Sequence, residues 1–440
     1  MTDKNRLELA RWVVTRAQKS GADQAAVGLT NRRDIEVEFR ERQLDTLKES
    51  TKNSLSLDIY AANRYSSHST NDLRRDALER FIEEAVAMTR YLGEDAYRKL
   101  PDPKYYEGQK DIDLNLFDES YHRMTPERRV GIARELEEAA LDQSSDIVTC
   151  SAGYDDILAE SVRVHSNGFE GRRETSRFWV GVSISLRDDA GGRPQDLSSA
   201  SVRFVGDIPD TGKLAAGAYE RVSRKIGPSK LASGIYDMII ENRAAGRLIS
   251  HLYYPMRGSY IQQKNSFLAG RIGDRIGSDK LTIIDDPFIP RALGSRLYDG
   301  EGIAARKRVM VDRGVLKEYF IDSYYGRKLG LEPTSGSSSN LTFDPGTRSL
   351  AELIDSMTRG ILVTGFIGGN SNSATGDFSV GVAGLYVENG QVVQPISEMN
   401  ISGNHNEFWH NLVEMGDDEY VYSSWRRPSM YFRDIQFSGI

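Results

Sequence analysis

The chain of 440 residues contains one cysteine, Cys150. A single cysteine excludes a scaffold stapled by intramolecular disulfides and is typical of a reducing compartment. No apolar run approaches the roughly 18 to 20 residues that a membrane-spanning helix needs. The N-terminus is charged from its third residue and predicts an amphipathic helix rather than a signal peptide. We therefore expect a cytoplasmic protein with no membrane partner.

The chain also has fewer basic residues than acidic residues. The sequence has 57 Lys and Arg residues against 64 Asp and Glu residues, which gives a net charge of -7. Such a surface weakly repels polyanions, so we expect no direct nucleic-acid binding. The sequence also contains no G-x-S-x-G elbow, no P-loop and no convincing dinucleotide fingerprint. These common routes to catalysis are therefore excluded.

Two stretches in the first half of the sequence repeat one pattern. Apolar residues at helical spacing predict a helix over Asn5–Lys19, and Pro126–Leu141, capped by Thr125, is its counterpart. Alternating apolar residues then predict half-buried strands in both copies. At one constant offset the matching positions are Phe39 and Val164, Leu55 and Val180, Leu57 and Val182, and Ile59 and Ile184. We interpret this match as a duplicated unit, with chance similarity of two strand-rich stretches as the alternative.

The sequence predicts an α+β fold in which two similar repeats of helix, antiparallel strands and helix precede a β-rich domain. The first repeat spans residues 1–92 and the second spans residues 114–226. Residues 93–113 form a linker, because this stretch has two prolines, many charges and little apolar periodicity. Strand and turn patterns dominate residues 227–440, which we assign to the C-terminal domain.

The segment HNEFWHNLVE, residues 405–414, is a candidate for metal binding. His410 and Glu414 are four residues apart and would share one face of a helix. His405 would lie about 140° away from His410 on the same helix, which disfavours a three-ligand cluster. We interpret the segment as a capped surface helix and keep a metal site of His405, His410 and Glu414 as the alternative.

A run rich in glycine and small polar residues extends from Asn370 to Gly384. Glycines let backbone amides approach a ligand closely, which suits peptide or anion binding. They equally suit tight corners of a curved sheet. The candidate residues for a peptide or partner cleft are Asn370, Ser371, Asn372, Gly376, Asp377 and Ser379.

Several short motifs occur in a fixed order along the chain. They are SFLAG at residues 266–270, DDP at 285–287, LYDGEG at 297–302, GVL at 314–316, NSNSATGDFSVGVAGLYVENG at 370–390 and ISGN at 401–404. In this order and spacing the set resembles the TldD/PmbA family over nearly the full length. The family is also known by an older name, modulator of DNA gyrase.

The resemblance also gives the place of the family's metal site. TldD-type members carry His-Glu-x-x-x-His shortly after an AAG-like helix start, and these positions fall on Ser250, His251 and Pro255. Serine is a poor zinc ligand, a lone imidazole replaces the carboxylate base, and proline has no side-chain donor. Cys150 lies far upstream of the family's cysteine ligand. The resemblance therefore implies the PmbA/TldE branch, which has no catalytic residue, metal or cofactor of its own.

The function implied by the resemblance is that of a non-catalytic subunit in a metallopeptidase complex. Zinc is expected in a TldD-type partner, and the substrate is expected to be a peptide or an unfolded protein in proteolysis or peptide maturation. When the partner is absent, a homodimer is one possible state, and the sequence does not decide whether it forms. One alternative is an autonomous hydrolase that uses His405, His410 and Glu414. The other is a regulatory protein that binds gyrase, which only the older family name supports.

Overall fold

The first half of the chain is built on a single antiparallel sheet. The computed structural model describes residues 3–188 and 191–439. Six strands lie in the order β3-β2-β1-β4-β5-β6. The helices and strands of this half are α1 (Asp3–Lys19), β1 (Gln24–Arg40), β2 (Gln43–Ala61), β3 (Arg64–Thr70), α2 (Arg75–Thr89), α3 (Pro126–Leu141), β4 (Ile147–His165), β5 (Glu170–Leu186), β6 (Gln195–Val202) and α4 (Thr211–Ser223).

The register of the strands confirms the predicted duplication. Leu29 of β1 pairs with Leu55 of β2, and the positions at the repeat offset, Tyr154 and Val180, pair in the same way. At the junction of the two copies, Arg33 of β1 pairs with Leu158 of β4, which is its own equivalent. The two units are therefore related by a local twofold axis, and each has the order helix, two long strands, short strand and helix.

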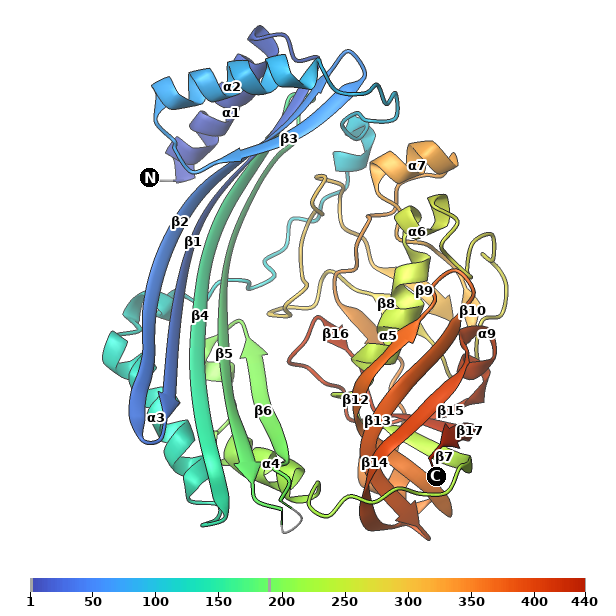
Figure 1. Ribbon diagram of the computed structural model, residues 1–440. Coiled ribbons are helices and arrows are strands. Elements are labelled where there is room, and N and C mark those ends of the chain that lie inside the picture. The colour runs from blue at the N-terminus through green and yellow to red at the C-terminus, as the bar shows by residue number, and fades with distance from the viewer. Residues whose placement is uncertain (1–2, 189–190, 440) are drawn as a thin grey trace.

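The helices cover the two ends of the long strands (Figure 1). Alternate residues of β2 turn their apolar side chains toward α1 and α2, and Leu55, Leu57 and Ile59 are fully buried there. The equivalent residues Val180 and Val182 of β5 are fully buried against α3 and α4. The matched apolar positions in the sequence are thus the core-facing positions of both units.

A buried ion pair connects α3 to β4 in the second unit. The Arg129 guanidinium donates from Nε to Asp156 Oδ2 at 2.5 Å, and both side chains are almost completely excluded from solvent. Tyr121 and Tyr154 donate their hydroxyls to the same carboxylate at 2.9 and 2.8 Å. The buried carboxylate of Asp156 is therefore paired with a cation and well hydrogen-bonded.

The segment between the two units lies against both halves of the molecule. It includes the short 3-10 helices η1 (Pro103–Tyr106) and η2 (Glu119–Arg123). The carbonyl of Leu116 accepts from Ser176 N on the part of β5 that β6 does not reach. The carbonyl of Leu114 accepts from Arg291 N in the C-terminal half. The segment thus connects the first sheet to the rest of the chain.

The second half of the chain contains two further sheets, with strand orders β10-β9-β8-β11-β16 and β14-β13-β12-β7-β17-β15. The second of these closes on itself because β14 also pairs with β17. The elements are β7 (Gly234–Ile240), α5 (Gly246–Tyr253), η4 (Tyr254–Met256), α6 (Gly258–Gln262), β8 (Ile283–Asp285), β9 (Arg308–Asp312), β10 (Val315–Leu316), α7 (Ser323–Leu329), β11 (Leu341–Phe343), α8 (Leu350–Asp355), β12 (Arg359–Ser371), β13 (Asp377–Glu388), β14 (Gln391–Asn404), α9 (His405–Phe408), η5 (Trp409–Asn411), β15 (Leu412–Met415), β16 (Trp425–Arg426) and β17 (Met430–Ser438).

The α+β fold with a β-rich C-terminal half is therefore confirmed. The bowed first sheet faces the C-terminal half across the molecule (Figure 1). In the part of the chain that the structure describes, we find no helix that is long and apolar enough to cross a membrane.

The buried ion pair gives a testable prediction about stability. Replacing Arg129 by Met leaves the carboxylate of Asp156 buried without its cation, so the free energy of unfolding should fall by about 3 to 5 kcal/mol. Arg134→Met is the matched control, because Arg134 lies on the exposed side of the same helix and contacts Glu138 only at 4.0 Å. The control should change stability by less than about 0.5 kcal/mol. Urea titrations measure both, and equal losses would contradict the role given to the pair.

Candidate functional site

Helix α5 carries the positions at which the sequence resemblance places the family's metal ligands. The helix is fixed by a buried apolar face that includes Leu248 and Leu252. Ser250 turns its hydroxyl back onto the helix and donates to the carbonyl of Arg247 at 2.6 Å. Pro255 is buried, and its carbonyl accepts from the Ser266 hydroxyl. Ser250 and Pro255 therefore form hydrogen bonds with neighbouring parts of the chain.

His251, the third of these positions, lies against a second histidine from a distant part of the chain. Its ring centroid is 5.2 Å from that of His405, which is fully buried. The His405 ring stacks on Phe378 at 4.5 Å and on Phe267 at 6.0 Å. Both ring nitrogens of His405 and Nδ1 of His251 lack a hydrogen-bond partner among the described residues. The two imidazoles thus occupy an aromatic, largely apolar environment.

This environment favours the neutral form of both rings. Burial lowers the pKa of His405 to about 3, with a further contribution from His251. Burial and the nearby Arg247 guanidinium lower the pKa of His251 to about 4. Both histidines are therefore uncharged at neutral pH, because a charged imidazole would be poorly solvated in this position.

The glycine-rich run forms the hairpin of β12 and β13 and lies directly beside the histidines. The carbonyl of Gly376 accepts from His405 N at 2.8 Å, and the carbonyl of Ser373 accepts from Phe267 N at 2.8 Å. Arg247 of α5 donates to the carbonyl of Gly369 on the same hairpin. The structure thus brings α5, the SFLAG segment, the hairpin and the start of α9 into one cluster, which we call the motif cluster.

Of the six residues of the predicted cleft, one is buried in the hairpin and five are exposed or half-exposed. Asp377 accepts from the Thr375 hydroxyl at 2.6 Å and from Asn404 Nδ2 at 2.8 Å, and these hydrogen bonds lower the pKa of its carboxyl. Gly376 is buried with a φ of +86°. The exposed or half-exposed residues of the set are Asn370, Ser371, Asn372, Asp377 and Ser379. Their role in binding a peptide or a partner stays a prediction.

The predicted helix over residues 405–414 is wrong. The chain forms the four-residue helix α9, then the 3-10 turn η5, and then the strand β15. Burial of Trp409 and pairing of β15 with β17 override the helical spacing of the apolar residues. His410 is exposed, whereas Glu414 is paired with Arg348 at 2.8 Å. Within the described ranges no three His, Cys, Asp or Glu side chains are grouped closely enough to share a metal ion.

The sequence did not predict some of the contacts in the motif cluster. The contact between His251 and His405 joins segments that are far apart in the sequence, so no local spacing could indicate it. Phe267 and Phe378 looked like ordinary apolar residues, although they form the walls around His405. The SFLAG and ISGN motifs were the available signal, since both lie in the cluster.

Comparison with known domains places the chain in a class of metallopeptidase proteins. Residues 25–89 match the PmbA/TldA metallopeptidase domain 1, residues 119–226 match the central domain and residues 233–439 match the C-terminal domain. The chain belongs to the PmbA/TldD family. The family assigned from the sequence motifs is therefore confirmed.

Individual relatives extend over nearly the whole chain. The metalloprotease PmbA of Escherichia coli O157:H7 is 27% identical over 95% of this chain and 93% of its own length. A Bacteroides thetaiotaomicron crystal structure, provisionally described as a modulator of DNA gyrase, is 39% identical with a TM-score of 0.97, and the match covers 100% of both chains. TldE from Thermococcus kodakarensis shares the fold, with a TM-score of 0.86 at 20% identity over 98% of this chain and 100% of that one.

The buried histidine predicts a defined pH dependence of stability. Because the pKa of His405 is about 3 in the folded chain and ordinarily near 6.5, unfolding takes up a proton between these values. The stabilisation is complete above about pH 6.5 and is lost as the pH falls toward about 3. His405→Phe should reduce the slope of unfolding free energy between these limits by about 1.4 kcal/mol per pH unit.

Urea titrations across this pH range measure the slope. His410→Phe is the control, because His410 is exposed and should leave the slope unchanged. An unchanged slope in His405→Phe would show that the imidazole is not held neutral by its surroundings.

The hairpin tip predicts a second, independent effect. A Cβ at Gly376 would lie 2.9 Å from Asn404 Oδ1, at a left-handed φ that disfavours any side chain. Gly368→Ala is the matched control, because Gly368 also has a positive φ but open space around it. Gly376→Ala should increase hydrogen exchange across the hairpin more than Gly368→Ala does. Equal exchange in both variants would mean that the close contact is not what holds the tip.

Proposed function

We propose that this chain is the metal-free subunit of a TldD-type metallopeptidase. The partner subunit supplies zinc and the general base, and this chain completes the peptide-binding cleft. The observation that carries the proposal is the environment of α5. Ser250 is bonded to its own helix, His251 packs on the buried His405, and Pro255 has no side-chain donor.

The chemistry of zinc hydrolysis supports this division of roles. A zinc hydrolase needs about three protein ligands, an open position for water and a base that accepts the water's proton. The side chains at the family's motif positions provide one imidazole, which does not fit that requirement. Cys150 is buried in the core between α3 and the first sheet, and burial raises its pKa to about 12, so it does not complement α5.

The glycine-rich hairpin supports the proposed role in the cleft. Its tip is held on both sides by the SFLAG segment and by the start of α9, while several polar side chains remain exposed. A fixed backbone with exposed polar groups can order an extended peptide or a partner loop at low entropic cost. The substrate is accordingly proposed to be a peptide or an unfolded protein.

The autonomous hydrolase with His405, His410 and Glu414 is not supported, because the helix that it requires is replaced by a turn and a strand. A gyrase-binding role has only the description of a relative in its favour. The single buried cysteine supports a reducing compartment, so we propose a cytoplasmic location.

The first test is metal content. The chain purified alone, without chelator, should bind no stoichiometric zinc, because α5 lacks the donor set. Elemental analysis measures this directly. One tightly bound zinc ion per chain would overturn the proposal.

The second test is complementation of peptidase activity. This chain alone should not cleave an unfolded peptide, and a mixture with a TldD-type subunit that carries an intact His-Glu-x-x-x-His should cleave it in a chelator-sensitive way. His251→Ala should leave the chemical step nearly intact, because the partner's glutamate is the base. Chelator-sensitive cleavage by this chain alone would contradict the assignment.

The hairpin is tested in the same assay with a matched pair of charge reversals. Asp377→Lys removes two hydrogen bonds at the tip and should lower the rate of the mixture about tenfold. Glu388→Lys reverses an exposed charge at the other end of the same strand and should change it less than twofold, a difference of about 0.4 kcal/mol. Equal rates in the two variants would remove the tip from the functional surface.

A further inference from the structure

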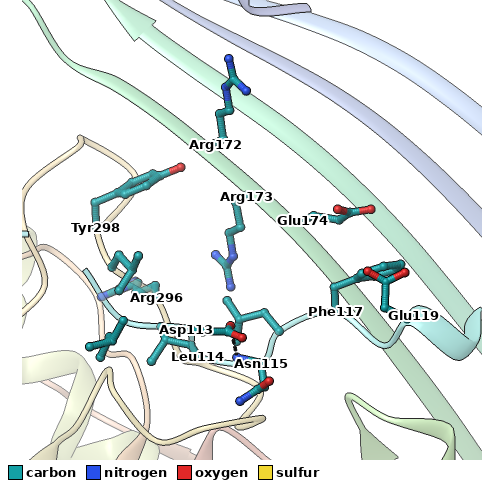
Figure 2. A pocket seen from close by; sticks show the side chains of 13 residues that line it. Asp113, Leu114, Asn115, Phe117, Glu119, Arg172, Arg173, Glu174, Arg296 and Tyr298 are labelled. Atoms are coloured by element: carbon teal, nitrogen blue, oxygen red, sulfur yellow. Dashed lines mark hydrogen bonds between the residues drawn. The ribbon is translucent and has the colours of Figure 1, made fainter. Parts of the chain in front are cut away.

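A cavity of about 330 Å³ lies where β5, the segment 112–119 and the loop 296–298 meet. It is separate from the motif cluster, with which it shares no lining residue. Figure 2 shows Arg173 extending from β5 toward the segment that carries Leu114 and Asn115, with Arg296 and Tyr298 alongside. The cavity is thus formed jointly by the first sheet, the connecting segment and the C-terminal half.

Two half-buried arginines, Arg173 and Arg296, line this cavity without a carboxylate of the described residues in direct contact. Arg173 donates from Nη2 to the carbonyl of Ser295 at 3.1 Å, whereas its buried Nε has no partner. Arg296 donates to the hydroxyls of Ser335 and Ser337 and to one carbonyl, and the Ser335 hydroxyl in turn donates to the Asp299 carboxylate at 2.7 Å. Among the described residues neither guanidinium is within 4 Å of a carboxylate oxygen.

A third arginine lies near Arg173. Arg203 is buried and donates to the carbonyls of Ser176 and Leu293, again without a carboxylate. Burial lowers the pKa of Arg173, with a further contribution from Arg296, and burial together with Arg173 lowers the pKa of Arg203 to about 10. Arg173 is therefore repelled by Arg203 and by Arg296 in a place where solvent cannot fully screen these charges.

A buried cation is normally paired, because desolvation without a counter-ion is costly. Backbone carbonyls satisfy some of the N–H groups here but bring no negative charge. An anion in the cavity would supply the missing charge and would accept from the guanidinium of Arg173. Asp113 and Glu119 also line the cavity, but within the described ranges neither carboxylate forms an ion pair with these arginines.

The residues that line the cavity indicate which kind of anion would fit it. Apolar side chains, among them Leu114, Phe117 and Leu297, form walls next to the arginine floor. A ligand with a planar anionic end and an apolar body would match both parts, and the guanidinium fork is suited to a carboxylate. A fully hydrated inorganic anion would leave the apolar walls without a partner.

We propose that this cavity binds the C-terminal carboxylate of a short peptide, with Arg173 as the residue that contacts it and the apolar walls accepting the last side chain. The inference rests on the proposed function in peptide handling. It adds a way in which the chain would distinguish a free peptide end from the middle of a longer chain.

The test measures binding to the isolated chain by calorimetry. The probes are an N-acetylated tripeptide that ends in leucine with a free carboxylate, the same tripeptide as the C-terminal amide, and inorganic phosphate. The acid should bind about tenfold to a hundredfold more tightly than the amide, as expected for a charged hydrogen-bonded pair. Equal binding of acid and amide, or no binding of either, would overturn the proposal.

Variants locate the site. Arg173→Gln should abolish the preference for the acid, whereas Arg177→Gln, which changes an exposed arginine four residues along the same strand, should retain it. A preference that survives in Arg173→Gln would place the carboxylate elsewhere and contradict the assignment. The comparison of acid with amide on the unaltered chain remains decisive if Arg173→Gln does not fold.

Two further outcomes separate the competing explanations. Phosphate that displaces the acid at equal or lower concentration would make the cavity a phosphate site and overturn the peptide assignment. Loss of the acid preference with intact activity of the mixed subunits would refute this inference alone. An inactive mixture with the acid preference retained would refute the proposed partnership and leave carboxylate binding in place.

Discussion

The antiparallel pairing of β1 with β4 constrains the whole first half of the molecule. Because side chains alternate across a strand, a slip of one residue would turn every core residue to the opposite face. Because of this pairing, one end of β1 and one end of β4 each pack in the core of the other unit. Ile35 and Val37 of β1 belong to the core under α3 and α4, whereas Val162 and Val164 of β4 belong to the core under α1 and α2. Neither unit can therefore complete its core without the other.

The sequence was most informative where structure is local and periodic. The matched pairs from Phe39 with Val164 to Ile59 with Ile184 predicted the repeat because strand alternation and a constant offset survive the loss of sequence similarity. The helix expected over residues 405–414 failed for the opposite reason, since β17 supplies distant pairing partners that local spacing cannot reveal. The sequence also could not predict which motifs lie together in space, although the fixed order of the motifs identified the family.

The motif cluster has a packed, largely apolar interior. Aromatic rings surround His405, and the Arg247 side chain of α5 donates to the carbonyl of Gly369 on the hairpin. A catalytic site must keep polar groups poorly satisfied until substrate arrives, and such groups lower stability. The ring nitrogens of His405, unpaired among the described residues, are such groups, and the neutral ring is held by packing against its aromatic neighbours.

The short strand β3 leaves part of its neighbour uncovered. It pairs with β2 only from Leu55 to Ala61, so the preceding residues of β2 present an open row of backbone donors and acceptors in the described structure. Such an edge is a template for aggregation. Lys48 and Lys52 project along it, and a register shift at Glu38/Phe39 disturbs its far end. The duplication gives β2 its length, and the charges of Lys48 and Lys52 therefore disfavour pairing of this long edge with a strand of another molecule.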